Sequence, residues 1–137
     1  MWSNKELSDL AVKLASNYTT VPLTQILTNT KKREITFTRQ IAFWLLKTHT
    51  TLSLYTIGTL VGNKDHATVF HGVKTIKDRM DVDNTFKFNM LHLSHEFGRV
   101  IESEVYDVNK ILEDFRDGIF DITQTAARLI IYLKQST

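Results

Sequence analysis

Apolar residues recur along this chain at intervals of three and four, the spacing that places side chains on one face of an α-helix. The first such segment begins at Ser3-Asn4-Lys5-Glu6, which fits a capping box, and ends at about Asn17. Pro22 suits the first turn of a short second helix over about 22–27. A third helix is predicted to begin near Thr36–Thr38, where either threonine can cap it, and to end at about His49.

Between residues 53 and 80 the pattern predicts a short helix, a turn and a longer helix. Ser53 can cap the short helix, which ends at about Val61 and is followed by Gly62, a residue that often ends helices in a left-handed conformation. The longer helix is expected from about Asp65 to Met80. A short helix, a turn with glycine and a longer helix together are typical of a helix-turn-helix.

The rest of the chain also carries a helical pattern. Asp83 can cap a long segment whose apolar positions continue to Gly118, and Asp121 with Gln124 can open a last helix. With five Gly and one Pro, the chain has too few turn residues for a β-sandwich or barrel. The expected fold is all-α, a multi-helix domain with a helix-turn-helix followed by further C-terminal helices.

Charge divides the chain into two parts, although the total is only +2. Residues 1–80 carry eleven Lys and Arg against five Asp and Glu, and residues 81–137 carry six against ten. A basic part joined to an acidic part is consistent with a polyanion-binding region, and ordinary solvated helix faces are the alternative explanation. We therefore divide the chain into a basic, candidate polyanion-binding region over 1–82 and an acidic helical extension over 83–137, packed on that region or on a partner.

The start of the longer helix carries side chains suited to DNA. A helix-turn-helix places the first residues of its second helix in the major groove. Here Lys64 and Thr68 can hold phosphates, Asp65 can accept from a cytosine amino group, His66 can bond a base edge, and the Ala67 methyl can contact a thymine methyl. His71 on the same helix is expected to be packed at or near the core.

Three ordered motifs make the indication more specific. They are Arg33-Glu34-Ile35-x-x-x-Arg39-Gln40-Ile41-Ala42, then Leu52-Ser53-Leu54-x-x-Ile57-Gly58, then Asp65-His66-Ala67-Thr68-Val69-x-His71. In this order and spacing the chain resembles the C-terminal DNA-binding domain of the bacterial replication initiator family DnaA. The resemblance spans roughly residues 5–100 and is strongest over 31–80.

The resemblance implies a helical domain that binds a short A/T-rich duplex element, the DnaA box. It places base contacts on Asp65, His66 and Ala67. It also places phosphate contacts at Lys64 and Thr68 and at three positions of the preceding helix. A minor-groove contact is placed in the polar, positively charged loop over 28–33, which we call the basic loop. The preceding helix positions are Arg39, Gln40 and Lys47, and those of the loop are Lys31 with Arg33 close by.

Several positions depart from the family pattern. Ala67 stands where Thr is usual, Lys31 and Lys64 stand where Arg is usual, and Asn63 stands where Gly is usual. Pro is also usual at the positions of Thr38 and Tyr55. Lysine keeps the charge of arginine without its planar fork, so we expect electrostatic DNA binding with an altered sequence preference.

The sequence excludes several other functions. Without Cys there is no thiolate metal site or cysteine nucleophile, and His92 with His95 has no further ligand cluster, so we expect no metal. The glycines never form a nucleotide-binding P-loop, and we expect neither a cofactor nor an enzyme. There is no apolar run long enough for a membrane span, and the polar start does not resemble a signal peptide, so a cytoplasmic location is expected.

Two functions remain open at this point. The first is sequence-specific binding of double-stranded DNA in control of replication initiation or transcription, by an excised domain or a stand-alone protein without the ATPase motor. The alternative is a regulatory adaptor that uses residues 83–137 to bind a protein partner or a second copy, with weak DNA binding. Apolar residues such as Ile119, Phe120, Ile130 and Ile131 could seal a dimer.

Overall fold

The part of the chain that the computed structural model describes, residues 2–116, 118, 122, 126, 129 and 130, is helical. It contains α1 (Asn4–Thr19), α2 (Leu23–Ile26), α3 (Arg33–His49), α4 (Leu54–Leu60), α5 (His66–Val82) and α6 (Asn84–Arg116), and no strand is found among these residues. This confirms the all-α prediction. The residues expected to open a last helix, Asp121 and Gln124, lie outside the described residues.

Helix α3 lies at the centre of the core. Nine of its 17 residues are buried, and its most extensive packing is against α1 and α5. Trp44 and Phe43 of this helix are both buried. On α5, Gly72 permits close packing, because a Cβ there would lie only 2.9 Å from the ring of Phe43.

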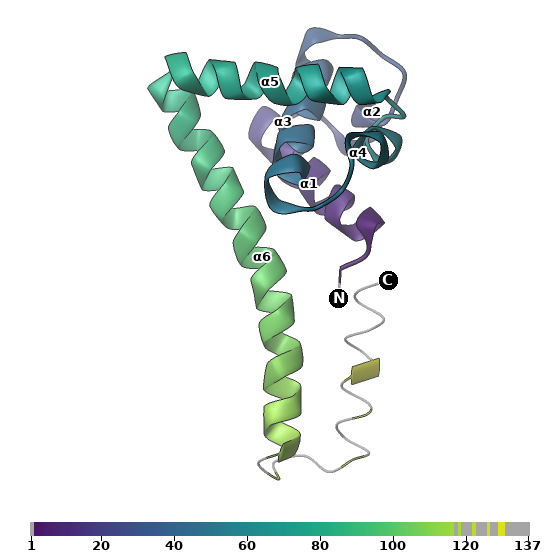
Figure 1. Ribbon diagram of the computed structural model, residues 1–137, viewed down its shortest axis with the longest axis vertical. Coiled ribbons are helices and arrows are strands. Elements are labelled where there is room, and N and C mark those ends of the chain that lie inside the picture. Colours follow the sequence, from purple (N-terminus) through teal and green to yellow (C-terminus); the bar gives the residue numbers. More distant parts are fainter. Residues whose placement is uncertain (1, 117, 119–121, 123–125, 127–128, 131–137) are drawn as a thin grey trace.

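Helix α6 begins on the body of the domain and then extends beyond it (Figure 1). Its first half contributes Phe86, Met90, Leu93 and Phe97 to the same core as the other helices. The indole Nε1 of Trp2 donates to the carbonyl oxygen of Ile101 at 3.4 Å, at the end of this docked half. The contacts therefore continue across the expected boundary at residue 82, and the first half of the extension packs on the helices of residues 1–82.

Several helix starts follow the sequence prediction. Ser3 and Glu6 form a complete capping box, Ser53 accepts from the amide of Thr56, and Asp65 accepts from the amide of Thr68. Pro22 is the residue that precedes α2. Local sequence decides these ends because each cap is made by side chains within one turn of the helix.

The start of α3 was predicted wrongly. The helix begins at Arg33, so Thr36 and Thr38 lie inside it and neither caps it. Ile35 is buried at the first turn and anchors it, and Glu34 is placed favourably for the helix dipole. Thr38 is fully buried, and its hydroxyl donates to the carbonyl of Glu34 at 2.7 Å.

His71 also differs from its prediction. It is exposed rather than packed in the core, and its ring meets the exposed ring of Phe70 edge-on with the centroids 5.6 Å apart. The buried face of α5 is formed by Val69, Gly72, Val73 and Ile76, which turns His71 to the opposite side. In the described part of the chain, none of the helices combines the length and the apolar character needed to cross a membrane.

Candidate nucleic-acid interface

The turn between α4 and α5 fixes where the second helix of the motif begins. Gly62 and Asn63 both have left-handed backbones, with φ of 80° and 51°. Asparagine tolerates this conformation better than most residues, which explains why it can replace glycine here. The amide of Lys64 donates to the carbonyl of Gly58 at 2.8 Å, and a Cβ on Gly58 would lie only 2.0 Å from the carbonyl oxygen of Lys64. The turn therefore requires glycine at position 58.

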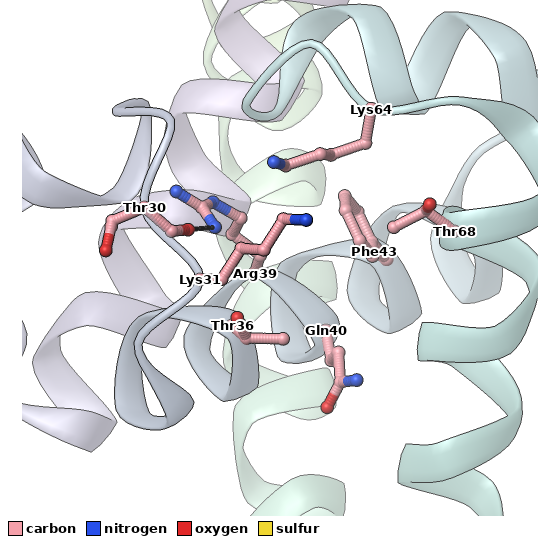
Figure 2. Close-up of a pocket in the computed structure, with 8 residues that line it drawn as sticks. All are labelled: Thr30, Lys31, Thr36, Arg39, Gln40, Phe43, Lys64 and Thr68. Carbon is pink, nitrogen blue, oxygen red and sulfur yellow. Dashed lines mark hydrogen bonds between the residues drawn. The ribbon is translucent and has the colours of Figure 1, made fainter.

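Five of the ten predicted DNA-binding residues line one hollow. It measures about 360 Å³ and lies between the loop before α3, the outer face of α3 and the start of α5 (Figure 2). Within the described residues, neither Lys31 nor Lys64 is paired with a carboxylate, which leaves their ammonium groups available for an anion. The five predicted residues are Lys31, Arg39, Gln40, Lys64 and Thr68, and Thr30, Thr36 and Phe43 complete the lining.

Arg39 has a different environment from that expected of a phosphate contact. Its side chain is buried, with 3% exposure, and its guanidinium is directed at main-chain carbonyls of the preceding loop. Nε donates to Ile26 at 2.6 Å and Nη1 to Thr30 at 2.7 Å, and Nη2 also donates to the carbonyl of Thr28. Burial lowers the pKa of Arg39.

The start of α5 presents three of the other predicted residues to solvent. Asp65, His66 and Ala67 are all exposed. The Oδ1 atom of Asp65 accepts from the amide of Thr68 at 2.7 Å, and this hydrogen bond holds the pKa of the carboxyl below its usual value. Asp65 therefore caps the helix on which His66 and Ala67 lie.

The structure places Arg33 and Lys47 away from the hollow. Arg33 is the first residue of α3 and is exposed. Lys47 is near the other end of α3 and lines a second hollow of about 260 Å³ with Lys74 and Lys77 of α5. The two hollows lie along the same helix.

The sequence interpretation missed three residues that line the 360 Å³ hollow, Thr30, Thr36 and Phe43, although the spacing along α3 gives a signal for two of them. Thr36, Gln40, Phe43 and Lys47 follow one another at intervals of four, three and four on α3. That spacing places them along one helix face.

Comparison with known families supports the geometry of the motif. Residues 9–76, which include the basic loop, α3, the turn and most of α5, match the family described as bacterial dnaA protein helix-turn-helix. Residues 9–76 belong to this DnaA family. The resemblance inferred from three short motifs is confirmed, and the family match covers the segments that form the 360 Å³ hollow.

Individual DnaA proteins are similar over the same part of the chain. The chromosomal replication initiator protein DnaA of Bacteroides fragilis is 48% identical over 63 residues, which is 46% of this chain and 13% of that protein. The DnaA of Bacteroides thetaiotaomicron is 40% identical and that of Lachnoclostridium phytofermentans is 35% identical, each over 79 residues, or 58% of this chain. The aligned region spans 17% of each of these two relatives.

Proposed function

We propose that this chain binds double-stranded DNA sequence-specifically at DnaA-box-like, A/T-rich elements, in control of replication initiation or transcription. The observation that carries the proposal is the convergence of Lys31, Lys64 and Thr68 on one hollow beside the exposed start of α5. Two segments far apart in sequence thus present cations and a hydroxyl to one region. A duplex presents phosphates on both sides of a groove, and cationic and hydroxyl side chains are among the groups that bind them.

The start of α5 is suited to the major groove. The helix begins with its capping residue Asp65, and the side chains of His66 and Ala67 are exposed there. In the proposed complex His66 bonds a base edge and the methyl of Ala67 contacts a thymine methyl, while Lys64 and Thr68 bind phosphates. Asp65 caps the helix through Oδ1 and also lies close to the base pairs as a hydrogen-bond acceptor.

The basic loop is suited to the adjacent minor groove. Lys31, Lys32 and Arg33 are consecutive and exposed, and Lys31 lines the same hollow as Lys64. A/T-rich minor grooves are narrow and have an enhanced negative potential, which favours inserted cationic side chains. In the proposed complex Lys31 or Arg33 enters this groove, and Gln40 and Lys47 bind phosphates farther along α3.

Selection from a random duplex library, followed by affinity measurements, tests this function. The purified chain is expected to enrich an A/T-rich motif and to bind it at least about a hundredfold more tightly than a scrambled duplex at physiological salt. The logarithm of the affinity should fall linearly with the logarithm of the salt concentration. A library from which no motif is enriched would contradict sequence-specific binding, and affinity independent of salt would contradict DNA binding altogether.

A protein-binding role is a second candidate, favoured by exposed apolar residues on α6. Phe88 is 70% exposed and Leu91 is 51% exposed, and these two residues lie three apart and so on the same helix face. In this role the face binds a second copy of the chain or another protein. Light scattering of the wild type and of the Phe88→Glu variant measures the mass directly, and a monomer in both would exclude self-association.

A further inference from the structure

Arg39 contacts both parts of the proposed DNA interface. On one side its guanidinium donates to the carbonyls of Ile26, Thr28 and Thr30, every second residue from the end of α2 into the basic loop. On the other side it touches the turn of the helix-turn-helix, because a Cβ on Gly62 would lie 3.1 Å from its Nε atom. One buried side chain therefore lies between the loop and the turn.

The loop depends on such a contact because its own sequence does little to restrict it. Residues 23–33 contain neither Pro nor Gly. The other hydrogen bonds of residues 27–32 are short-range, such as that from the amide of Lys32 to the hydroxyl of Thr30 at 3.3 Å. A planar guanidinium that donates to the carbonyls of three alternate residues restricts both the distance of the loop backbone from α3 and its orientation.

The turn is equally restricted on its side of Arg39. Gly62 has a φ of 80°, and a side chain there would displace the guanidinium. Lys64, two residues later, lines the same hollow as Lys31, which directly follows Thr30. Arg39 thus lies between the two segments that carry Lys31 and Lys64.

We propose that Arg39 is a positioning residue that holds the basic loop at a set distance from α5, so that minor-groove and major-groove contacts form together. This inference rests on the proposed DNA-binding function. It replaces the phosphate contact that the sequence led us to expect of Arg39. The phosphate-binding alternative makes different predictions, which separate the two roles.

Two variants of Arg39 distinguish positioning from phosphate binding. Arg39→Lys keeps the charge and loses the planar fork, and Arg39→Met keeps the stem and loses the charge. If Arg39 is a positioning residue, both variants should bind the selected duplex about tenfold or more weakly, since contacts of the loop are lost. The salt slope should decrease by about two in both, because the cationic side chains of Lys31 and Arg33 lose their contacts with the DNA together. A phosphate contact predicts near-normal binding by Arg39→Lys and a slope reduced by about one in Arg39→Met.

A base substitution that alters only the minor groove of the duplex separates a lost loop contact from a general loss of protein stability. Lower stability alone would not change how the affinity responds to this substitution. Replacing adenine by 2,6-diaminopurine adds an amino group in the minor groove and leaves the major-groove edge unchanged. The wild type should lose affinity when this change is made where the loop inserts, and Arg39→Lys should be insensitive to it. Both proteins should still respond to replacing thymine by uracil under α5, which removes only the major-groove methyl. If the Arg39→Lys variant still loses affinity when adenine is replaced by 2,6-diaminopurine, the inference is overturned.

Matched controls address the surrounding charge and the fold. Lys13→Met removes an exposed cation of α1 that has no assigned role in binding, so it should keep both groove responses. If the Arg39 variants fail to fold, the wild type alone still decides the question through the Nε–H signal of Arg39 in its NMR spectrum. For a positioning residue, this proton should be protected from exchange in the free protein and barely shift on DNA binding. A signal that is protected only in the complex would identify a phosphate contact. If selection enriches no motif, the proposed sequence-specific function itself fails. That outcome is distinct from the two that assign Arg39 a positioning role or a phosphate contact.

Discussion

The imidazole Nε2 of His49 on α3 lies 2.6 Å from the hydroxyl oxygen of Ser94 on α6. The same ring packs against Phe97, with the ring centroids 5.1 Å apart, and lies beside Gly98. The helix that carries Gln40 and Arg39 is thereby joined to the first half of α6. The attachment is made by a titratable residue, which gives it a pH dependence.

Protonation of His49 is expected to weaken the folded protein. Burial lowers the pKa of His49, and the groups of α6 around it, Ser94, Phe97 and Gly98, offer no negative charge. The unfolded chain therefore binds this proton more readily than the folded protein does. The contribution is fully present above the unperturbed pKa of about 6.5 and is lost as the pH falls below it. Urea midpoints between about pH 7.5 and pH 5.5 measure it.

The His49→Gln variant is the control for this effect. Glutamine retains hydrogen-bonding capacity toward Ser94 and does not titrate, so the decrease in midpoint toward pH 5.5 should be smaller than in the wild type. The remaining histidines are exposed, which limits their contribution. Identical pH profiles in the two proteins would show that His49 is not the group responsible.

Truncation of Phe97 should detach α6 from the body at a large energetic cost. Phe97 is fully buried in the shared core, and Phe→Ala at such a site costs about 3–5 kcal/mol of unfolding free energy. Phe88→Ala on the same helix removes a ring that is 70% exposed and should change stability by less than about 0.5 kcal/mol. Urea unfolding compares the two. Equal effects would mean that α6 is not packed on the core in solution.

Adding a methyl group to Gly58 should damage the turn that positions α5. The new Cβ would lie 2.0 Å from the carbonyl oxygen of Lys64, so the backbone must move, and we expect a loss of about 2 kcal/mol or more. Gly98→Ala is the matched control, because its Cβ would be 3.6 Å from the nearest atom of His49. Alanine also has the higher helix propensity, so this variant should be about 0.5–1 kcal/mol more stable. Thermal unfolding of both variants gives the comparison.

His66 and Lys47 should affect DNA binding in different ways. Both are exposed, but His66 lies at the start of α5 and Lys47 near the end of α3. Removing the base contact with His66→Ala should reduce discrimination between the selected and scrambled duplexes by about 1–3 kcal/mol. Lys47→Ala should weaken binding to both duplexes about equally and reduce the salt slope by about one. Fluorescence anisotropy over a salt series measures both quantities, and equal effects of both variants on the two duplexes would contradict this assignment of roles.

Local sequence was sufficient wherever the decisive interaction lies within one helical turn. Ser3 and Ser53 were identified as caps because the amides they bind are three residues away. The same reasoning failed at the start of α3, since the threonines at 36 and 38 can cap a helix just as well as they can lie inside one. There the burial of Ile35 decided the matter, and burial depends on what the helix packs against.

The sequence by itself determined that the chain is helical, where its basic part lies and that it carries the DnaA-type helix-turn-helix, because these follow from periodicity, charge and ordered motifs. Only the tertiary structure decided that Arg39 is turned inward onto the carbonyls of the loop while Lys31 and Lys64 meet across one hollow. An arginine on a basic helix has the same sequence signature whether it binds a phosphate or a carbonyl. Its partner is set by the acceptors that folding brings within reach, and those of Arg39 lie nine to 13 residues away.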